Sequence, residues 1–142
     1  MIQFQKQIPV SRDKLWSALT ELDQMRQWYF KELKDFEPEV GFETSFTFEY
    51  QGKKFTHQWR VYEVLPLDRI SYHWKYQEYE GDSIVSFELE EAPQGVLLRL
   101  EAHILKPFPP LEEFSQKNME EGWRNLIEDR LTPFLIKKNL SN

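Results

Sequence analysis

The chain contains no cysteine, which excludes disulfide bonds, thiolate metal ligands and a cysteine nucleophile. It also lacks a hydrophobic run of the length needed to cross a bilayer, about 20 apolar residues. The opening residues, MIQFQKQIPV, include no apolar segment typical of a secretory signal. These absences predict a cytoplasmic protein that does not insert into a membrane.

Positive charge is scarce as well. The formal net charge is −6, and acidic and basic residues are interspersed. Nucleic-acid-binding domains usually carry a net positive charge or a basic stripe, so we expect no nucleic-acid partner. The length of 142 residues fits one domain with one core, and we expect residues 1–142 to form it.

Aromatic residues, in contrast, are abundant: they make up 15% of the chain and include five tryptophans. Many lie in segments where apolar and polar residues alternate, which predicts strands near 44–50, 53–64, 69–77, 83–91 and 96–105. Turn signals separate these segments at Gln51-Gly52, Pro66, Glu80-Gly81 and Pro93–Gly95. The pattern predicts an antiparallel meander.

Counting outward from each turn as a two-residue loop predicts the register of the sheet. The predicted pairs are Phe46–His57, Phe48–Phe55, Leu65–Asp68, Trp59–Trp74, His57–Tyr76, Tyr79–Asp82, Trp74–Phe87, Tyr76–Val85, Leu89–Leu98 and Phe87–Leu100. Paired residues share a side of the sheet, so one face is apolar and the other polar. A change of alternation after Val61 predicts a bulge between Arg60 and Glu63.

The remaining segments supply a first strand and the helices. Ile2, Phe4 and Ile8 alternate as a strand, after which Ser11 can cap a short helix that buries Leu15, Trp16 and Leu19. A second short helix, capped by Asp23, is expected to end at Trp28. We expect residues 31–43 to form a loop with a short edge strand.

A long amphipathic helix is predicted from about Leu111 to Leu131, and Pro133 is expected to kink or end its regular part. Its apolar stripe, at helical spacing, comprises Met119, Trp123, Leu126, Ile127, Phe134 and Leu135. Gly122 interrupts this helix at a cost of about 1 kcal/mol relative to alanine. We therefore expect Gly122 either to allow close contact with the sheet or to leave space for a guest molecule.

Three segments carry a family resemblance: PVSRDKLWSALTELDQMRQWYF (9–30), HQWRVYEVLPLDRISYHW (57–74) and EEGWRNLIEDRLTPFL (120–135). They resemble the START-like helix-grip superfamily, and more narrowly its bacterial branch named for the activator of the heat-shock protein 90 ATPase. The resemblance implies an α+β fold in which a curved antiparallel sheet of six to seven strands wraps a long C-terminal helix, with two short helices after the first strand. The eukaryotic co-chaperone that names the branch has an additional N-terminal domain, and its C-terminal domain is the part that corresponds to this chain.

Members of the superfamily hold a small hydrophobic molecule, such as a lipid or polyketide-like compound, between the sheet and the long helix. The residues expected to line such a cavity are Trp28, Phe48, Tyr50, Phe55, His57, Trp59, Tyr72, Trp74, Tyr76, Phe87, Leu100, Gly122, Trp123, Leu126 and Ile127. The alternative is that these rings pack against one another and leave no space, because protein interiors are close-packed.

His57 lies on the apolar face, where burial should lower its pKa and favour the neutral imidazole. We expect a core histidine bonded to a tyrosine hydroxyl. The alternative is contact with a ligand, or acid–base chemistry as in the cyclases and dehydratases of the superfamily, with Glu63 as a weaker second candidate. His73 and His103 face the other way, so we expect no metal site, and we assign no cofactor and no catalytic residue.

A third hypothesis is a chaperone-associated interaction domain with a role in the stress response. Phe108 and the PFPP segment, together with Trp28, Tyr29 and Phe30, would then form an exposed apolar patch for a partner protein. We expect a monomer or a weak homodimer.

Overall fold

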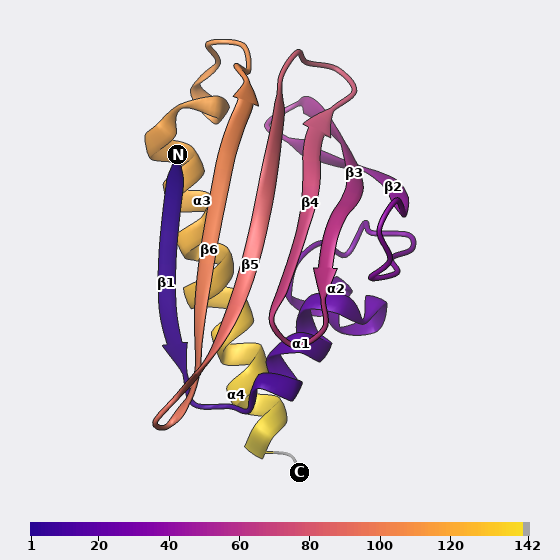
Figure 1. Ribbon diagram of the computed structural model, residues 1–142. Coiled ribbons are helices and arrows are strands. Elements are labelled where there is room, and N and C mark those ends of the chain that lie inside the picture. Colours follow the sequence, from indigo (N-terminus) through magenta and orange to yellow (C-terminus); the bar gives the residue numbers. More distant parts are fainter. Residues whose placement is uncertain (141–142) are drawn as a thin grey trace.

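The computed structural model describes residues 1–140 and contains one six-stranded antiparallel sheet with the helices on its concave side (Figure 1). Strand β1 (Ile2–Ile8) is followed by α1 (Arg12–Thr20) and α2 (Leu22–Trp28). The meander then comprises β2 (Glu43–Tyr50), β3 (Lys53–Leu65), β4 (Arg69–Tyr76), β5 (Asp82–Ala92) and β6 (Gly95–Lys106). Because β1 pairs with β6, the strand order is β1-β6-β5-β4-β3-β2. The predicted α+β helix-grip architecture is confirmed.

The long C-terminal helix is built from several helical segments. A 3-10 turn, η1 (Glu112–Phe114), precedes α3 (Gln116–Arg124), a π-helical stretch η2 (Asn125–Leu131) and α4 (Thr132–Leu140). The predicted start at Leu111 is wrong. The Ser115 side chain accepts a hydrogen bond from the Asn118 N–H at 3.2 Å and begins the helix there.

Pro133 neither kinks the chain out of the helix nor stops it, although the regular α geometry ends before it. A proline lacks an N–H, and its ring crowds the carbonyl four residues earlier. Here both the N–H and the hydroxyl of Thr132 reach the Ile127 carbonyl, five residues back, and this wider turn precedes the proline. The helix then continues to Leu140.

Two hairpins have the predicted register, and a third reaches it through two compensating deviations. In β2/β3, Phe46 pairs with His57, and in β5/β6, Leu89 pairs with Leu98. In β3/β4, Leu65 pairs with Arg69 rather than Asp68, because the turn holds one more residue than predicted. The predicted bulge, between Val61 and Glu63, offsets this and restores the pair Trp59–Trp74.

The predicted register of β4/β5 is wrong. Trp74 pairs with Ser83 rather than Phe87, and Tyr72 rather than Tyr76 pairs with Val85. The cause is the connection, which spans residues 77–81 instead of a two-residue turn. The displacement is an even number of residues, so each side chain stays on its predicted face.

Smaller predictions also need correction. Asp23 lies in the first turn of α2 but does not cap it: the N-cap is Glu21, without a side-chain bond. No strand forms between residues 31 and 42. Tyr50 lies on the predicted face of the sheet, although it is 48% exposed at the end of β2. Ser11 caps α1 as predicted.

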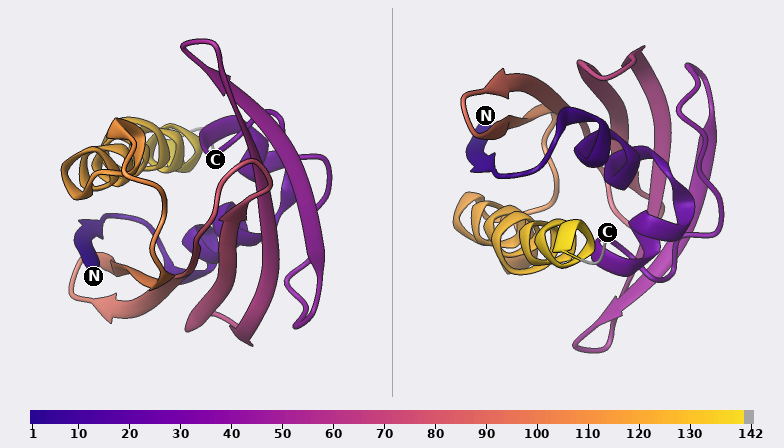
Figure 2. Two further views of the ribbon diagram at one scale, coloured as in Figure 1. Left: turned by 90° about the horizontal axis from the view of Figure 1, so that it is seen from above. Right: turned by 90° about the horizontal axis from the view of Figure 1, so that it is seen from below.

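The two short helices and the long helix cover one face of the sheet. Seen from above and below, α1 and α2 fill one end of the space between the sheet and the long helix (Figure 2). The opposite face carries ion pairs across the strands, such as Arg69–Glu63 at 2.7 Å and Arg69–Glu88 at 2.9 Å. Within residues 1–140, no helix is long and apolar enough to cross a membrane.

Candidate functional site

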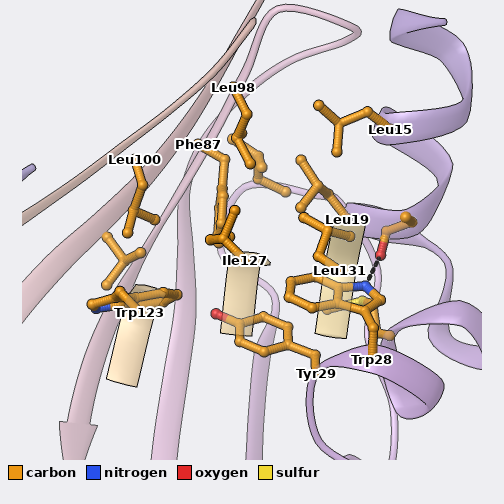
Figure 3. Packing of buried hydrophobic residues seen from close by; sticks show 14 of the residues in the cluster. Leu15, Leu19, Trp28, Tyr29, Phe87, Leu98, Leu100, Trp123, Ile127 and Leu131 are labelled. Atoms are coloured by element: carbon orange, nitrogen blue, oxygen red, sulfur yellow. Dashed lines mark hydrogen bonds between the residues drawn. The ribbon is translucent and has the colours of Figure 1, made fainter. Parts of the chain in front are cut away.

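Tyr29, directly after α2, fills the space between the sheet and the long helix at one end of the fold (Figure 3). Its ring centroid lies 4.3 Å from that of Trp28, 5.3 Å from Trp59 and 6.3 Å from Trp123. Its hydroxyl lies 2.6 Å from that of Tyr72, and burial raises the pKa of both phenols, so both stay neutral. This ring closes the core at the α1/α2 end.

The Trp28 ring is fully buried beside Tyr29, and its Nε1 donates to the Ala18 carbonyl at 2.7 Å. Because Tyr29 occupies the intervening space, several residues expected to line a cavity belong to this closed core instead. They are Trp28, Trp59, Tyr72, Phe87, Leu100 and Ile127. These six residues do not border the cavity described below.

A cavity of about 600 Å³ lies beyond this closed core, between the first half of the long helix and the sheet. The predicted lining residues that border it are Phe48, Tyr50, Phe55, His57, Trp74, Tyr76, Gly122, Trp123 and Leu126. The cavity exists because α3 lies against β1 and stands apart from β2–β4, as the view from above shows (Figure 2). Its volume falls in the range of small-molecule sites, roughly 300–1,000 Å³.

Gly122 borders this cavity. A Cβ placed on Gly122 would meet no heavy atom within 4 Å. Of the two expectations for this glycine, close contact with the sheet is therefore wrong. Gly122 instead leaves open space in the cavity wall.

The segment before the long helix covers the other end of the cavity. The Phe114 ring lies 5.3 Å from Tyr76 and 5.2 Å from Phe108. Glu113 accepts a hydrogen bond from Lys53 at 2.8 Å, which ties this segment to the start of β3 and lowers the pKa of the Glu113 carboxyl. Phe114 is not among the predicted lining residues, because the predicted helix begins at Leu111 and includes it. Ser115 is a typical N-cap residue, and this signal could have placed the helix start after Phe114.

The exposed apolar patch predicted for a partner protein does not form. Trp28 and Tyr29 are buried in the core, and Phe30 lines the cavity wall. Phe108 is half-buried because its ring packs over Gly81, where a Cβ would lie 2.2 Å from it.

His57 lies in the cavity wall and is 4% exposed. Its ring stacks on Phe46 at 4.6 Å, and Nδ1 donates to the Phe55 carbonyl at 3.0 Å. The expected tyrosine partner is thus wrong. Burial lowers the pKa of His57 to about 4, as expected, so the imidazole is neutral. With the proton on Nδ1, Nε2 is a hydrogen-bond acceptor.

Tyr76, opposite His57 on β4, provides a donor in the same wall. Trp74 Nε1 donates to the Tyr76 hydroxyl oxygen at 2.8 Å. No acceptor for the Tyr76 hydroxyl proton and no donor to His57 Nε2 is recorded within residues 1–140. Burial raises the pKa of Tyr76 to about 12, so the phenol keeps its proton. His57 and Tyr76 therefore add one neutral acceptor and one neutral donor to this wall.

These groups suit binding better than proton transfer. A histidine with a pKa near 4 is a weak base at neutral pH. Glu63 lies away from the cavity and is paired with Arg69 at 2.7 Å. His73 lies 3.3 Å from Asp82, and His103 lies 3.4 Å from Glu101. In the described part of the chain, no group of three or more histidine, aspartate or glutamate residues could hold a metal ion.

Solved structures with the same fold include proteins of several bacteria. Protein MLL2253 from Mesorhizobium loti is 26% identical, with a TM-score of 0.76 over 96% of this chain and 96% of that chain. The Aha1 dimer from Colwellia psychrerythraea is 17% identical, with a TM-score of 0.70 over 94% of each chain. DynU16, a protein of the dynemicin biosynthetic locus, is 21% identical, with a TM-score of 0.75 over 94% of this chain and 46% of that chain.

No curated protein matches the chain. The family model described as Activator of Hsp90 ATPase homolog 1-like protein matches residues 9–135, which is most of the sequence. The chain therefore belongs to this family, within the START-like helix-grip superfamily.

Proposed function

We propose that the protein binds a small hydrophobic molecule, of lipid or polyketide-like character, in the cavity between the sheet and the long helix and releases it unchanged. The observation that carries this proposal is the cavity of about 600 Å³, walled by aromatic side chains beside a closed core. A protein of this size can fill its interior completely. An unfilled space with a few polar groups in an apolar wall is the usual form of a ligand site.

The weak basicity of His57 favours binding over catalysis. His57 is neutral, and its partner is a backbone carbonyl rather than a carboxylate that would raise its basicity. One protein of the same fold belongs to the dynemicin biosynthetic locus, which agrees with a small-molecule role.

Native mass spectrometry of the purified protein tests this proposal. We expect the chain to carry an adduct of low mass that unfolding releases, leaving the unmodified chain mass. Gly122→Trp, which places a ring in the open space of the wall, should abolish the adduct. Asp129→Trp, on an exposed helix position outside the cavity, is the matched control and should retain it.

The same spectra distinguish the other hypotheses. A chain without any adduct that also fails to take up added hydrophobic compounds would overturn the proposal. A stable complex with a chaperone and an empty cavity would support the interaction hypothesis instead. The Colwellia relative is a dimer, and the native mass also reports whether this chain forms one.

A further inference from the structure

The charged residues that border the cavity are all acidic. They are Glu112, Glu113 and Glu121, and the lining includes no lysine or arginine. Lys53 offsets Glu113 through their ion pair. Glu112 also interacts electrostatically with Lys53, without a direct ion pair, and Glu121 makes no ion pair within residues 1–140. The three carboxylates outnumber this one lysine, so an anionic ligand would approach a net negative charge, which disfavours its entry.

The walls are made of ring faces rather than flexible aliphatic chains. The ring-bearing residues come from the end of α2, from the two strands β3 and β4, and from η1 and α3: Phe30, Phe55, Trp74, Tyr76, Phe114 and Trp123. Flat faces pack well against a flat ligand, in stacked or edge-to-face contacts. The ring faces also carry partial negative charge, which attracts cations and repels anions.

His57 and Tyr76 add a requirement for a hydrogen-bond donor. They are paired across β3 and β4, with ring centroids 4.9 Å apart. His57 Nε2 can accept a hydrogen bond from a ligand O–H or N–H, and a ligand hydroxyl can accept in turn from Tyr76. A carboxylate has no proton for Nε2, and no cation in the wall offsets the cost of burying its charge.

We propose that this cavity selects an aromatic compound that carries a hydrogen-bond donor and no negative charge. This inference rests on the proposed function, since it narrows the hydrophobic ligand to one chemical class. It excludes fatty acids and anionic phospholipids, because their head groups carry a net negative charge. A hydroxylated aromatic compound meets all three features of the wall.

A competition assay tests this selection. N-phenyl-1-naphthylamine, an uncharged fluorescent compound, reports occupancy of the cavity. Three naphthalenes then compete with it at pH 7: 2-naphthol, which has a donor; 2-methoxynaphthalene, which has none; and 2-naphthoate, which is anionic. We expect 2-naphthol to bind about fivefold more tightly than the methyl ether, as one hydrogen bond allows, and 2-naphthoate to bind at least about tenfold more weakly than 2-naphthol.

Variants assign each preference to its residues. In His57→Phe, which keeps a ring beside Phe46, the preference for 2-naphthol over its methyl ether should disappear. In Glu112→Gln/Glu121→Gln, 2-naphthoate should gain affinity while 2-naphthol is unchanged. Glu37→Gln/Glu39→Gln makes the same change of net charge outside the cavity lining and should leave all three affinities unaltered.

The outcomes separate this inference from the proposed function. If the wild-type protein fails to bind N-phenyl-1-naphthylamine, the proposed function fails. If the fluorescent compound binds but 2-naphthoate or dodecanoate displaces it as well as 2-naphthol does, the cavity is a binding site and the selectivity is refuted. Equal gains of 2-naphthoate affinity in both double variants would refute the proposed role of Glu112 and Glu121 in repelling anions.

Discussion

Replacing Gly122 by alanine should stabilise the protein. The position lies inside α3, where glycine costs about 1 kcal/mol relative to alanine. A new Cβ would meet no heavy atom within 4 Å, so no steric penalty opposes this gain. We expect the free energy of unfolding to rise by about 1 kcal/mol and the melting temperature by about 4 °C.

Urea and thermal unfolding followed by circular dichroism measure this effect. Gly52→Ala is the matched control, since its added Cβ also meets nothing within 4 Å, but its φ of 79° disfavours alanine. This control should be destabilised by about 1 kcal/mol. If Gly122→Ala lowers the stability instead, the helix lies closer to the sheet than the structure indicates, and the open wall at Gly122 is refuted.

Three further predictions concern buried groups. Tyr72→Phe should lower the free energy of unfolding by about 2 kcal/mol by stranding the Tyr29 hydroxyl, and the double variant Tyr29→Phe/Tyr72→Phe should recover most of it in urea titrations; additive losses would contradict this. The pKa of His57 falls from 6.5 to about 4 on folding, so the unfolded chain binds a proton first as the pH falls. Stability should therefore be lost between pH 6.5 and 4, by about 3 kcal/mol relative to His57→Phe, with no difference in slope above pH 7; equal slopes in urea titrations across that range would refute this. Gly81→Ala should cost about 2 kcal/mol, because of its φ of 124° and its approach to Phe108. In the Phe108→Ala background this cost should shrink, and an unchanged cost would show that the ring contact is irrelevant.

The facing of the strands could be predicted from the sequence even where the pairing was wrong. The predicted partner of Trp74 on β5 is Phe87, whereas the observed partner is Ser83. The Trp74 ring nevertheless lies on the predicted, inward face. Side chains alternate along a strand, so an error of an even number of residues preserves the face. The length of the 77–81 connection was not predictable from Glu80-Gly81 alone, because Tyr79 packs against Phe55 of β3 and Phe114 of η1, and these contacts hold the connection in place.

The division between core and cavity could not be predicted in the same way. Phe87 and Trp74 lie on the same face of the sheet, but only Trp74 borders the cavity. Alternation reports which face a residue is on and says nothing about what covers it. That cover comes from Tyr29, which is remote in sequence from both strands.

The aromatic triplet Trp28-Tyr29-Phe30 sets that boundary, and its local geometry explains how. α2 ends at Trp28, and Tyr29 leaves the helical conformation, with φ −97° and ψ −84°. The three consecutive rings therefore do not spread around a helix as regular geometry would require. The rings of Trp28 and Tyr29 stack within the core, with centroids 4.3 Å apart. The Phe30 ring packs beside Tyr29, with centroids 5.0 Å apart, and lines the cavity. Enlarging the cavity should therefore begin at Tyr29, since this ring separates the closed core from the open space.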